Sequence, residues 1–119
     1  MSNQAEIRSI VNRFIEAIET NDVETVPLAH DVVYSGPMMP EPLRGEARVR
    51  QHLAEVVPFV LRQRIKWMVV EDDSAAVVFG FEGLNGVRIE GAEFFRIRDG
   101  LICEDRVFFD TRPLIQGRV

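Results

Sequence analysis

The sequence predicts an α+β protein in which a curved antiparallel sheet wraps around helices to form a cone. In the first half of the chain, apolar residues recur at helical spacing. In the second half, segments that alternate between apolar and polar residues are separated by turn residues. Gly80 and Gly91 interrupt these segments, and glycines at such places favour the bends that a curved sheet needs.

Three helices are expected in the first half. Residues 5–20 form the first, with Asn3 and Glu6 as an N-terminal capping pair. Asn21 is expected to cap a short second helix, in which Pro27 is tolerated only near the first turn. The third begins at residues 45–47 and ends or kinks at Pro58. The apolar stripes of the first and third helices are Ile7, Ile10, Val11, Phe14, Ile15 and Ile18, and Val49, Leu53, Val56 and Val57.

Five strands are expected around and after the third helix. A short strand at residues 32–34 precedes a proline-rich loop at 35–45, which we expect to be irregular. Long strands then follow at residues 64–71, 75–82, 87–98 and up to about 110, with turns at 72–74 and 83–86. Within the first of these long strands, Ile65, Trp67 and Val69 alternate and are expected to share a face.

The last hairpin, residues 92–110, has two alternative registers around its turn signal Asp99-Gly100. A two-residue turn would leave neither side of the hairpin cleanly apolar. A three-residue loop at 98–100, with Gly100 left-handed at a bulge, gives one apolar and one mostly charged face. We predict the second register, whose inner face is Glu93, Phe95, Ile97, Leu101, Cys103, Asp105, Val107 and Phe109.

Composition narrows the function classes. A chain of 119 residues with 46% hydrophobic content can bury a core as one domain, residues 1–119. The net charge of −5 argues against nucleic acid or an anionic membrane as a partner. The single cysteine, Cys103, provides neither an intramolecular disulfide nor a metal cluster. Because no signal-like or membrane-spanning segment stands out, a cytoplasmic location is expected.

Two carboxylates on the apolar face of the hairpin are the strongest functional signal. Ionised Glu93 would be costly in an apolar cavity, so it should be protonated or bonded to a partner. Asp105 lies across from it in the chosen register, and two neighbouring carboxyls suppress each other's ionisation. His52, beside the apolar stripe of the third helix, is a second candidate proton partner. We predict Glu93, Asp105 and His52 as catalytic candidates, with a structural ion pair of Glu93 as the alternative.

The remaining candidates are expected to contact a ligand. Tyr34, the only tyrosine, lies where the short strand meets the loop, and Met38 is an adaptable side chain on that loop. The other residues of this kind are predicted as core and cavity wall: Phe14, Ile18, Trp67, Phe79, Phe81, Phe95, Val107 and Phe109. Cys103 is expected to be a small buried residue.

Four segments in this order resemble the nuclear transport factor 2-like superfamily, and its SnoaL-like branch in particular. They are IVNRFIEAIETNDVETV, DVVYSGP, EPLRGEARVRQHL and EFFRIRDGLICEDRVFFD. The resemblance covers almost the whole chain and implies a cystatin-like α+β roll with a pocket at its wide end. It also implies a homodimer through the outer sheet face, which we expect to be Phe94, Arg96, Ile102, Arg106 and Phe108.

The same resemblance bears on catalysis. Ketosteroid isomerase, a member of the branch, has a catalytic tyrosine where Phe14 stands and a general-base aspartate near Gly36. Its hydrogen-bonding aspartate falls on Glu93. Limonene-epoxide hydrolase ends the corresponding strand with a pair like Phe109-Asp110 but has a catalytic acid where Val107 stands.

Two hypotheses follow. The first is a SnoaL-like protein that binds, and converts by acid–base chemistry without metal or cofactor, a small hydrophobic carbonyl compound, as an isomerase, cyclase or hydrolase. The second is a non-catalytic ligand-binding or dimeric interaction module, suggested by the changes at Phe14, Gly36 and Val107.

Overall fold

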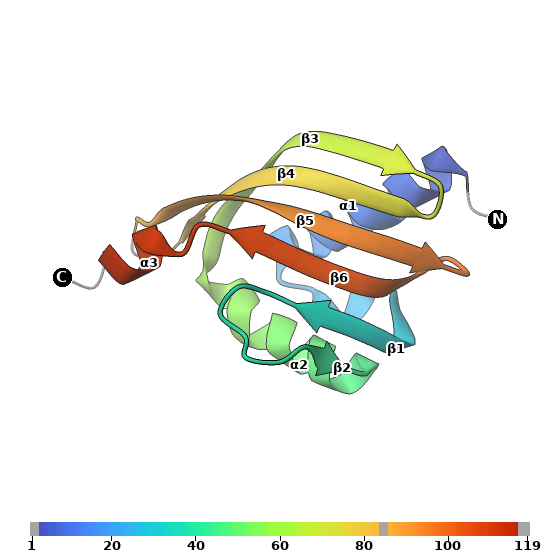
Figure 1. Ribbon diagram of the computed structural model, residues 1–119, viewed down its shortest axis with the longest axis horizontal. Coiled ribbons are helices and arrows are strands. Elements are labelled where there is room, and N and C mark those ends of the chain that lie inside the picture. Colours follow the sequence, from blue (N-terminus) through green and yellow to red (C-terminus); the bar gives the residue numbers. More distant parts are fainter. Residues whose placement is uncertain (1–2, 84–85, 117–119) are drawn as a thin grey trace.

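A computed structural model describes residues 3–83 and 86–116 of the chain (Figure 1). Its helices are α1 (Gln4–Thr20), α2 (Glu46–Val56) and α3 (Arg112–Gln116), with single 3₁₀ turns η1 (Val23–Thr25) and η2 (Val57–Phe59). Its strands are β1 (Leu28–Ser35), β2 (Leu43–Arg44), β3 (Val60–Glu71), β4 (Ser74–Gly83), β5 (Arg88–Arg98) and β6 (Leu101–Phe109).

The strands form one sheet in the order β2-β1-β6-β5-β4-β3. Neighbouring strands are antiparallel except β1 and β6, which are parallel. In Figure 1 the sheet curves around α1, which lies behind β3 to β5, and α2 lies beside β1 at the other end. The curved, unclosed sheet with helices on its inner side confirms the predicted α+β fold.

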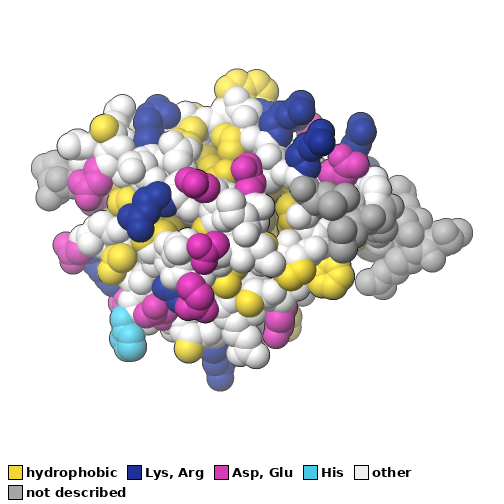
Figure 2. Space-filling view, turned by 180° about the vertical axis from the view of Figure 1, so that it is seen from behind, with side chains coloured by type: hydrophobic (Ala, Val, Ile, Leu, Met, Phe, Trp, Pro, Cys, Tyr) yellow, Lys and Arg dark blue, Asp and Glu magenta, His cyan; other side chains and the backbone are white. Residues whose placement is uncertain are grey.

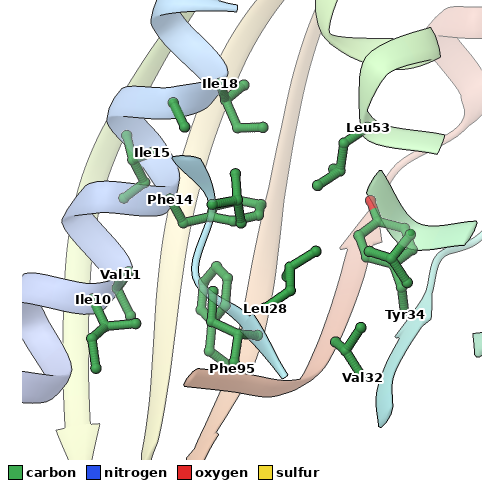
Figure 3. Close-up of a cluster of buried hydrophobic side chains, with 14 of the residues drawn as sticks. Ile10, Val11, Phe14, Ile15, Ile18, Leu28, Val32, Tyr34, Leu53 and Phe95 are labelled. Atoms are coloured by element: carbon green, nitrogen blue, oxygen red, sulfur yellow. The ribbon is translucent and has the colours of Figure 1, made fainter. Parts of the chain in front are cut away.

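Helix α1 follows the sequence pattern closely. The side chain of Asn3 accepts a hydrogen bond from the backbone N–H of Glu6 at 2.8 Å, as expected for an N-cap. Its apolar stripe is buried against the sheet (Figure 3). Asn21 ends α1 in the left-handed conformation, so it does not cap a second helix as predicted.

The predicted second helix is only the 3₁₀ turn η1, and β1 begins directly after Pro27. His30 therefore lies within a strand. The proline-rich loop is also less irregular than expected, because β2 pairs with β1. The last strand ends at Phe109, close to the predicted end near residue 110, and the short helix α3 follows it. The predicted turn at 83–86 includes Leu84 and Asn85, which lie outside the described residues.

A bulge in β3 corrects the predicted alternation. Ile65 pairs with Phe79 of β4, and Trp67 pairs with Val78, which is adjacent to Phe79. Lys66 therefore has no partner of its own on β4 and is the extra residue of the bulge. Beyond the bulge the inward side chains are Met68 and Val70 rather than Trp67 and Val69. Trp67, 66% exposed, thus lies on the outer face of the sheet, because one added residue reverses every later side chain.

The β5–β6 hairpin combines parts of both registers considered above. Arg98 pairs with Leu101, and Asp99 and Gly100 both have positive φ, so the turn has two residues rather than three. The extra residue is Cys103, since Ile97 pairs with Ile102 but Arg96 pairs with Glu104. Ile102 is therefore buried and Leu101 exposed, opposite to the prediction, whereas from Asp105 onward the predicted inner face is correct.

The core lies between the helices and the inner face of the sheet. Figure 3 shows Phe14 of α1 beside Phe95 of β5, whose rings meet edge to face with centroids 5.1 Å apart. On the other side, Tyr34 of β1 points its hydroxyl toward Leu53 of α2. The sheet therefore packs on α1 through Phe95 and faces α2 through Tyr34. The candidate site lies between these two places.

Candidate functional site

An apolar cavity of about 610 Å³ lies between the helices and the inner face of the sheet. The helices and the turn after α2 contribute Phe14, Ile18, Leu53, Val56, Val57, Phe59 and Leu114 to its wall. The strands and the β4–β5 connection contribute Tyr34, Val60, Gln63, Phe79, Phe81, Gly83, Val87, Ile89, Glu93, Val107 and Phe109. Phe59 is 64% exposed, so the cavity reaches the protein surface beside η2.

Only three polar side chains occur among the described lining residues: Tyr34, Gln63 and Glu93. A mostly apolar cavity with a few polar groups is the usual form of a small-molecule site. These three side chains therefore define where a bound molecule can form hydrogen bonds.

Strand pairing arranges the site in rows across the sheet. Tyr34, Asp105 and Phe95 form one row, because Asp105 pairs with Tyr34 on one side and with Phe95 on the other. Glu93 and Val107 form the next row toward the cavity. Alternate residues of a strand share a face, so Glu93 and Asp105 lie on the same inner face as predicted. Glu93 is diagonal to Asp105 rather than directly opposite it, because the two-residue turn and the bulge at Cys103 shift the pairing.

Among the residues whose burial the structure describes, Glu93 and Asp105 are the two buried charged ones, at 5% and 0% exposure. Glu93 lines the cavity, whereas Asp105 lies beneath it. Neither forms an ion pair with a basic residue in residues 3–83 and 86–116. Both carboxyl oxygens of Asp105 are buried and lack a partner in hydrogen-bonding geometry, so its interaction with Glu93 is looser than a regular hydrogen bond.

The two carboxyls differ in their tendency to ionise. Burial raises the pKa of Glu93, and its interaction with the Asp105 carboxyl opposes part of that rise. Burial, reinforced by the negative charge of Glu93, holds the pKa of Asp105 well above its usual range. Both carboxyls are therefore harder to ionise than exposed ones, and the effect is stronger for Asp105.

Tyr34 completes the polar end of the cavity. Burial, together with the neighbouring acidic groups of Asp105 and Glu93, raises the pKa of Tyr34 well above its usual range, so its hydroxyl stays protonated. The His52 ring lies 5.1 Å from the Tyr34 ring, centroid to centroid. Burial lowers the pKa of His52. A neutral histidine thus flanks the tyrosine, but it is outside the cavity lining.

The structure brings most of the predicted ligand contacts together. Those that line the cavity are Phe14, Ile18, Tyr34, Phe79, Phe81, Val107 and Phe109. Phe95 lies fully buried in the core beside Phe14. Met38, 57% exposed, and Trp67 lie away from the cavity on the surface, so both placements were wrong. The bulge at Lys66 explains why the Trp67 side chain lies on the outer face. Met38 belongs to the loop between β1 and β2, where its side chain is exposed to solvent.

Several lining residues were not predicted as site residues. Three of them belong to the apolar stripe that the sequence showed for the third helix: Leu53, Val56 and Val57. Phe59 lies at the cavity edge in the turn η2, whose position the sequence indicated through Pro58. Gln63 had no such signal. The sequence suggested a strand that starts at residue 64, which left Gln63 outside it, whereas β3 starts at Val60 and places Gln63 on the same face as Ile65.

The described residues contain no cluster of histidine, cysteine, aspartate or glutamate able to hold a metal ion. Nor do they include a helix long and apolar enough to cross a membrane. On the face of the molecule seen in Figure 2, acidic and basic side chains are interspersed and do not form a basic patch.

Comparison with known proteins places the chain in a family. A family model described as a SnoaL-like domain matches residues 11–105, and the chain belongs to that family. No curated protein sequence matches. Among solved structures, an NTF2-like protein of unknown function from Cytophaga hutchinsonii has a TM-score of 0.80 at 23% identity, with 97% of this chain and 99% of that one covered.

Two solved structures with named activities share the fold. An LEH-like epoxide hydrolase from M. tuberculosis has a TM-score of 0.79 at 22% identity, covering 95% of this chain and 89% of that one. A steroid delta-isomerase from Pseudomonas aeruginosa has a TM-score of 0.82 at 19% identity, covering 98% and 88%. The chain thus has the NTF2-like cone fold, in which isomerases and hydrolases both occur, and at these identities the likeness concerns the fold alone.

Proposed function

We propose that this protein binds a small hydrophobic carbonyl compound in the cavity and moves a proton on it by acid–base chemistry. The observation that carries the proposal is Glu93, a buried carboxyl in the cavity wall with no basic ion-pair partner among the described residues. A carboxyl with a raised pKa in a cavity is a common form of catalytic acid or base.

Each polar group has a distinct proposed role. The Glu93 carboxylate takes a proton from the carbon next to the ligand's carbonyl group and later returns it to the ligand. The Tyr34 hydroxyl donates a hydrogen bond to the carbonyl oxygen, where negative charge develops as the proton leaves. Asp105, protonated and beneath the cavity, stabilises the ionised form of Glu93 and is a positioning residue. His52 packs on Tyr34 and orients its ring.

The alternative proposal is a binding protein without catalysis. It is supported by the apolar residues Phe14 and Val107 in the cavity wall, where the resembling isomerase and epoxide hydrolase carry catalytic side chains. Under this alternative, Glu93 and Tyr34 only form hydrogen bonds to the ligand and hold it in one orientation.

Deuterium exchange separates the two proposals. The bicyclic ketone 2-tetralone is incubated with the protein in D₂O, and loss of the signal of its α-protons is followed by NMR. If the protein is catalytic, Glu93→Gln slows the enzyme-dependent exchange by about 10²–10⁴-fold, while the Kd for the ketone changes little. Glu90→Gln is the matched control, because Glu90 lies on the same strand but is exposed and paired with Lys66.

The outcomes are distinct. Binding without exchange above the Glu93→Gln background would favour the non-catalytic alternative. Equal exchange in the native protein and Glu93→Gln would overturn the catalytic role of Glu93. Mass spectrometry of small molecules that co-purify with the protein would identify the ligand class directly.

We also propose that the outer face of the sheet pairs with a second copy of the chain. Strand pairing places Trp67, Val78, Ala92 and Phe108 in one row across β3 to β6 on this face. Trp67 and Phe108 are 66% and 51% exposed, and monomeric proteins seldom leave such apolar rows uncovered. Ile102, expected on this face from the sequence, is buried on the inner side instead.

A further inference from the structure

Gln63 is the one polar side chain of the described cavity wall that lies away from Glu93 and Tyr34. It extends from the inner face of β3, and its amide oxygen Oε1 is buried without a hydrogen-bond partner among the described residues. The other β3 residues that face inward beyond it, Ile65, Met68 and Val70, are all apolar. Gln63 is therefore a polar residue on an inner face whose other named residues are apolar.

The sheet register separates Gln63 from Glu93. Gln63 pairs with Phe81, which pairs in turn with Ile89. Ile89 is four residues from Glu93 on β5, which is about 13 Å along the strand, and β3 lies two strands from β5, or about 10 Å across. No single polar group of a ligand can therefore contact both Gln63 and Glu93.

A buried amide oxygen without a partner is unfavourable by roughly 1–3 kcal/mol. A ligand that donates a hydrogen bond to Gln63 Oε1 removes this cost, whereas a wholly apolar ligand end at the same place does not. The amide also carries N–H groups, so it can serve a ligand hydroxyl as acceptor or donor. The rest of the wall between Gln63 and Glu93, including Phe79, Phe81 and Ile89, is apolar.

We infer that Gln63 is a specificity-determining residue and that the ligand is an elongated, mostly apolar molecule with a hydrogen-bonding group at each end. One end contacts Glu93 and Tyr34, and the other bonds to the Gln63 amide beside the aromatic wall. This inference rests on the proposed binding function and adds the shape and polarity of the ligand class.

Two stilbenes that differ by one terminal hydroxyl test the inference. Trans-4,4′-dihydroxystilbene has a hydroxyl at each end, and trans-4-hydroxystilbene has only one. Their Kd values are measured by fluorescence titration. The native protein should bind the diol about 5–13-fold more tightly, the ratio expected for one added hydrogen bond of about 1–1.5 kcal/mol. In Gln63→Leu this preference should disappear or reverse, because the hydroxyl would then be buried without a partner.

Gln51→Leu is the matched control, since Gln51 is exposed on α2 outside the cavity, and it should keep the native preference. Gln63→Met provides a second apolar variant of similar size if Gln63→Leu does not fold. If the native protein binds both stilbenes but shows no preference, or if Gln63→Leu keeps the preference, the inference about Gln63 is overturned while ligand binding in the cavity stands. If neither stilbene binds the native protein, the inference about an elongated ligand with two polar ends is overturned, whereas the proposed function is tested separately by the exchange experiment with 2-tetralone.

Discussion

Tyr34 and Asp105 are direct partners in the parallel pairing of β1 with β6, and both side chains are buried on the inner face of the sheet. The pairing brings a phenol hydroxyl that keeps its proton close to a carboxyl that also keeps its proton. Glu93, in the adjacent row, is the group of the three that we propose to ionise. The candidate chemistry therefore depends on pairing between the first long strand of the chain and its last.

The raised pKa of Asp105 predicts a stability that decreases as pH increases. Above the ordinary carboxyl pKa of about 4, the unfolded chain has lost this proton while the folded protein still holds it. The free energy of unfolding should thus fall with pH, by at most about 1.4 kcal/mol per pH unit for one group, until the pH passes the raised pKa. Asp105→Asn should remove this contribution, as measured by urea denaturation between about pH 5 and pH 9.

Asp73→Asn is the control for this experiment, because Asp73 is exposed in the β3–β4 turn. Its pH dependence should match that of the native protein. A native protein whose stability rises across the same pH range, with Asp105→Asn showing the same rise, would contradict the assignment of the retained proton to Asp105.

Gly91 should not tolerate a side chain. A Cβ atom at this position would lie 2.8 Å from the Cβ of Phe109 and closer still to the carbonyl oxygen of Phe108. Because β5 and β6 would have to move apart, Gly91→Ala should lower the free energy of unfolding by about 1–3 kcal/mol. At Gly80 the nearest atoms to such a Cβ are 3.8 Å away, so Gly80→Ala should be nearly neutral in the same denaturation experiment. Equal stability of the two variants would refute the close approach.

Deleting Cys103 should be tolerated, whereas deleting Arg106 should not. Cys103 is the extra residue of the β6 bulge, and without it Ile102 and Asp105 would still face inward on a regular strand. Removing Arg106 instead would turn Val107 and Phe109 outward, away from the cavity. The first variant should show one cooperative thermal transition and the second a destabilised or absent one. If the Cys103 deletion were the more destabilised of the two variants, the bulge rather than the alternation beyond it would determine the stability of β6.

Trp67→Glu should convert a dimer into a monomer. The substitution places a charge in the exposed apolar row of the outer face, where a second copy is proposed to pack, and desolvating that charge opposes association. Analytical ultracentrifugation at micromolar concentration is the measurement. Phe59→Glu is the control, since Phe59 is equally exposed but lies at the cavity edge. A native protein that sediments as a monomer would rule out the proposed interface.

The fold was predictable because it follows from apolar periodicity that extends over whole helices and strands. The stripe of α1, including Phe14, and the alternation around Phe95 each require one buried face, and both were placed correctly. Bulges were not predictable in position, because one added residue changes local pairing without changing the overall pattern. This is why Trp67 and Ile102 were assigned to the wrong faces, whereas Glu93 and Asp105 were placed on the correct one.

The site could be predicted only where a polar residue stands out from its neighbours in the sequence. Glu93 and Asp105 were recognisable as charged residues at apolar positions, a contradiction that the sequence itself displays. Gln63 shows no such contradiction, because Arg62 and Arg64 flank it and the segment looks like any polar strand. Its inward direction is shown by its place in the cavity wall and by its buried amide oxygen.

The position of β6 between β1 and β5 has a consequence for the order of folding. During synthesis β1 emerges early, but it can acquire its parallel neighbour only after β6 has also left the ribosome, about 70 residues later. Until then β1 and β5 both present unpaired backbone groups, which makes early intermediates prone to association. Contacts this distant in sequence also slow folding. A chain truncated at residue 100 should therefore collect in aggregates rather than form a smaller native-like sheet.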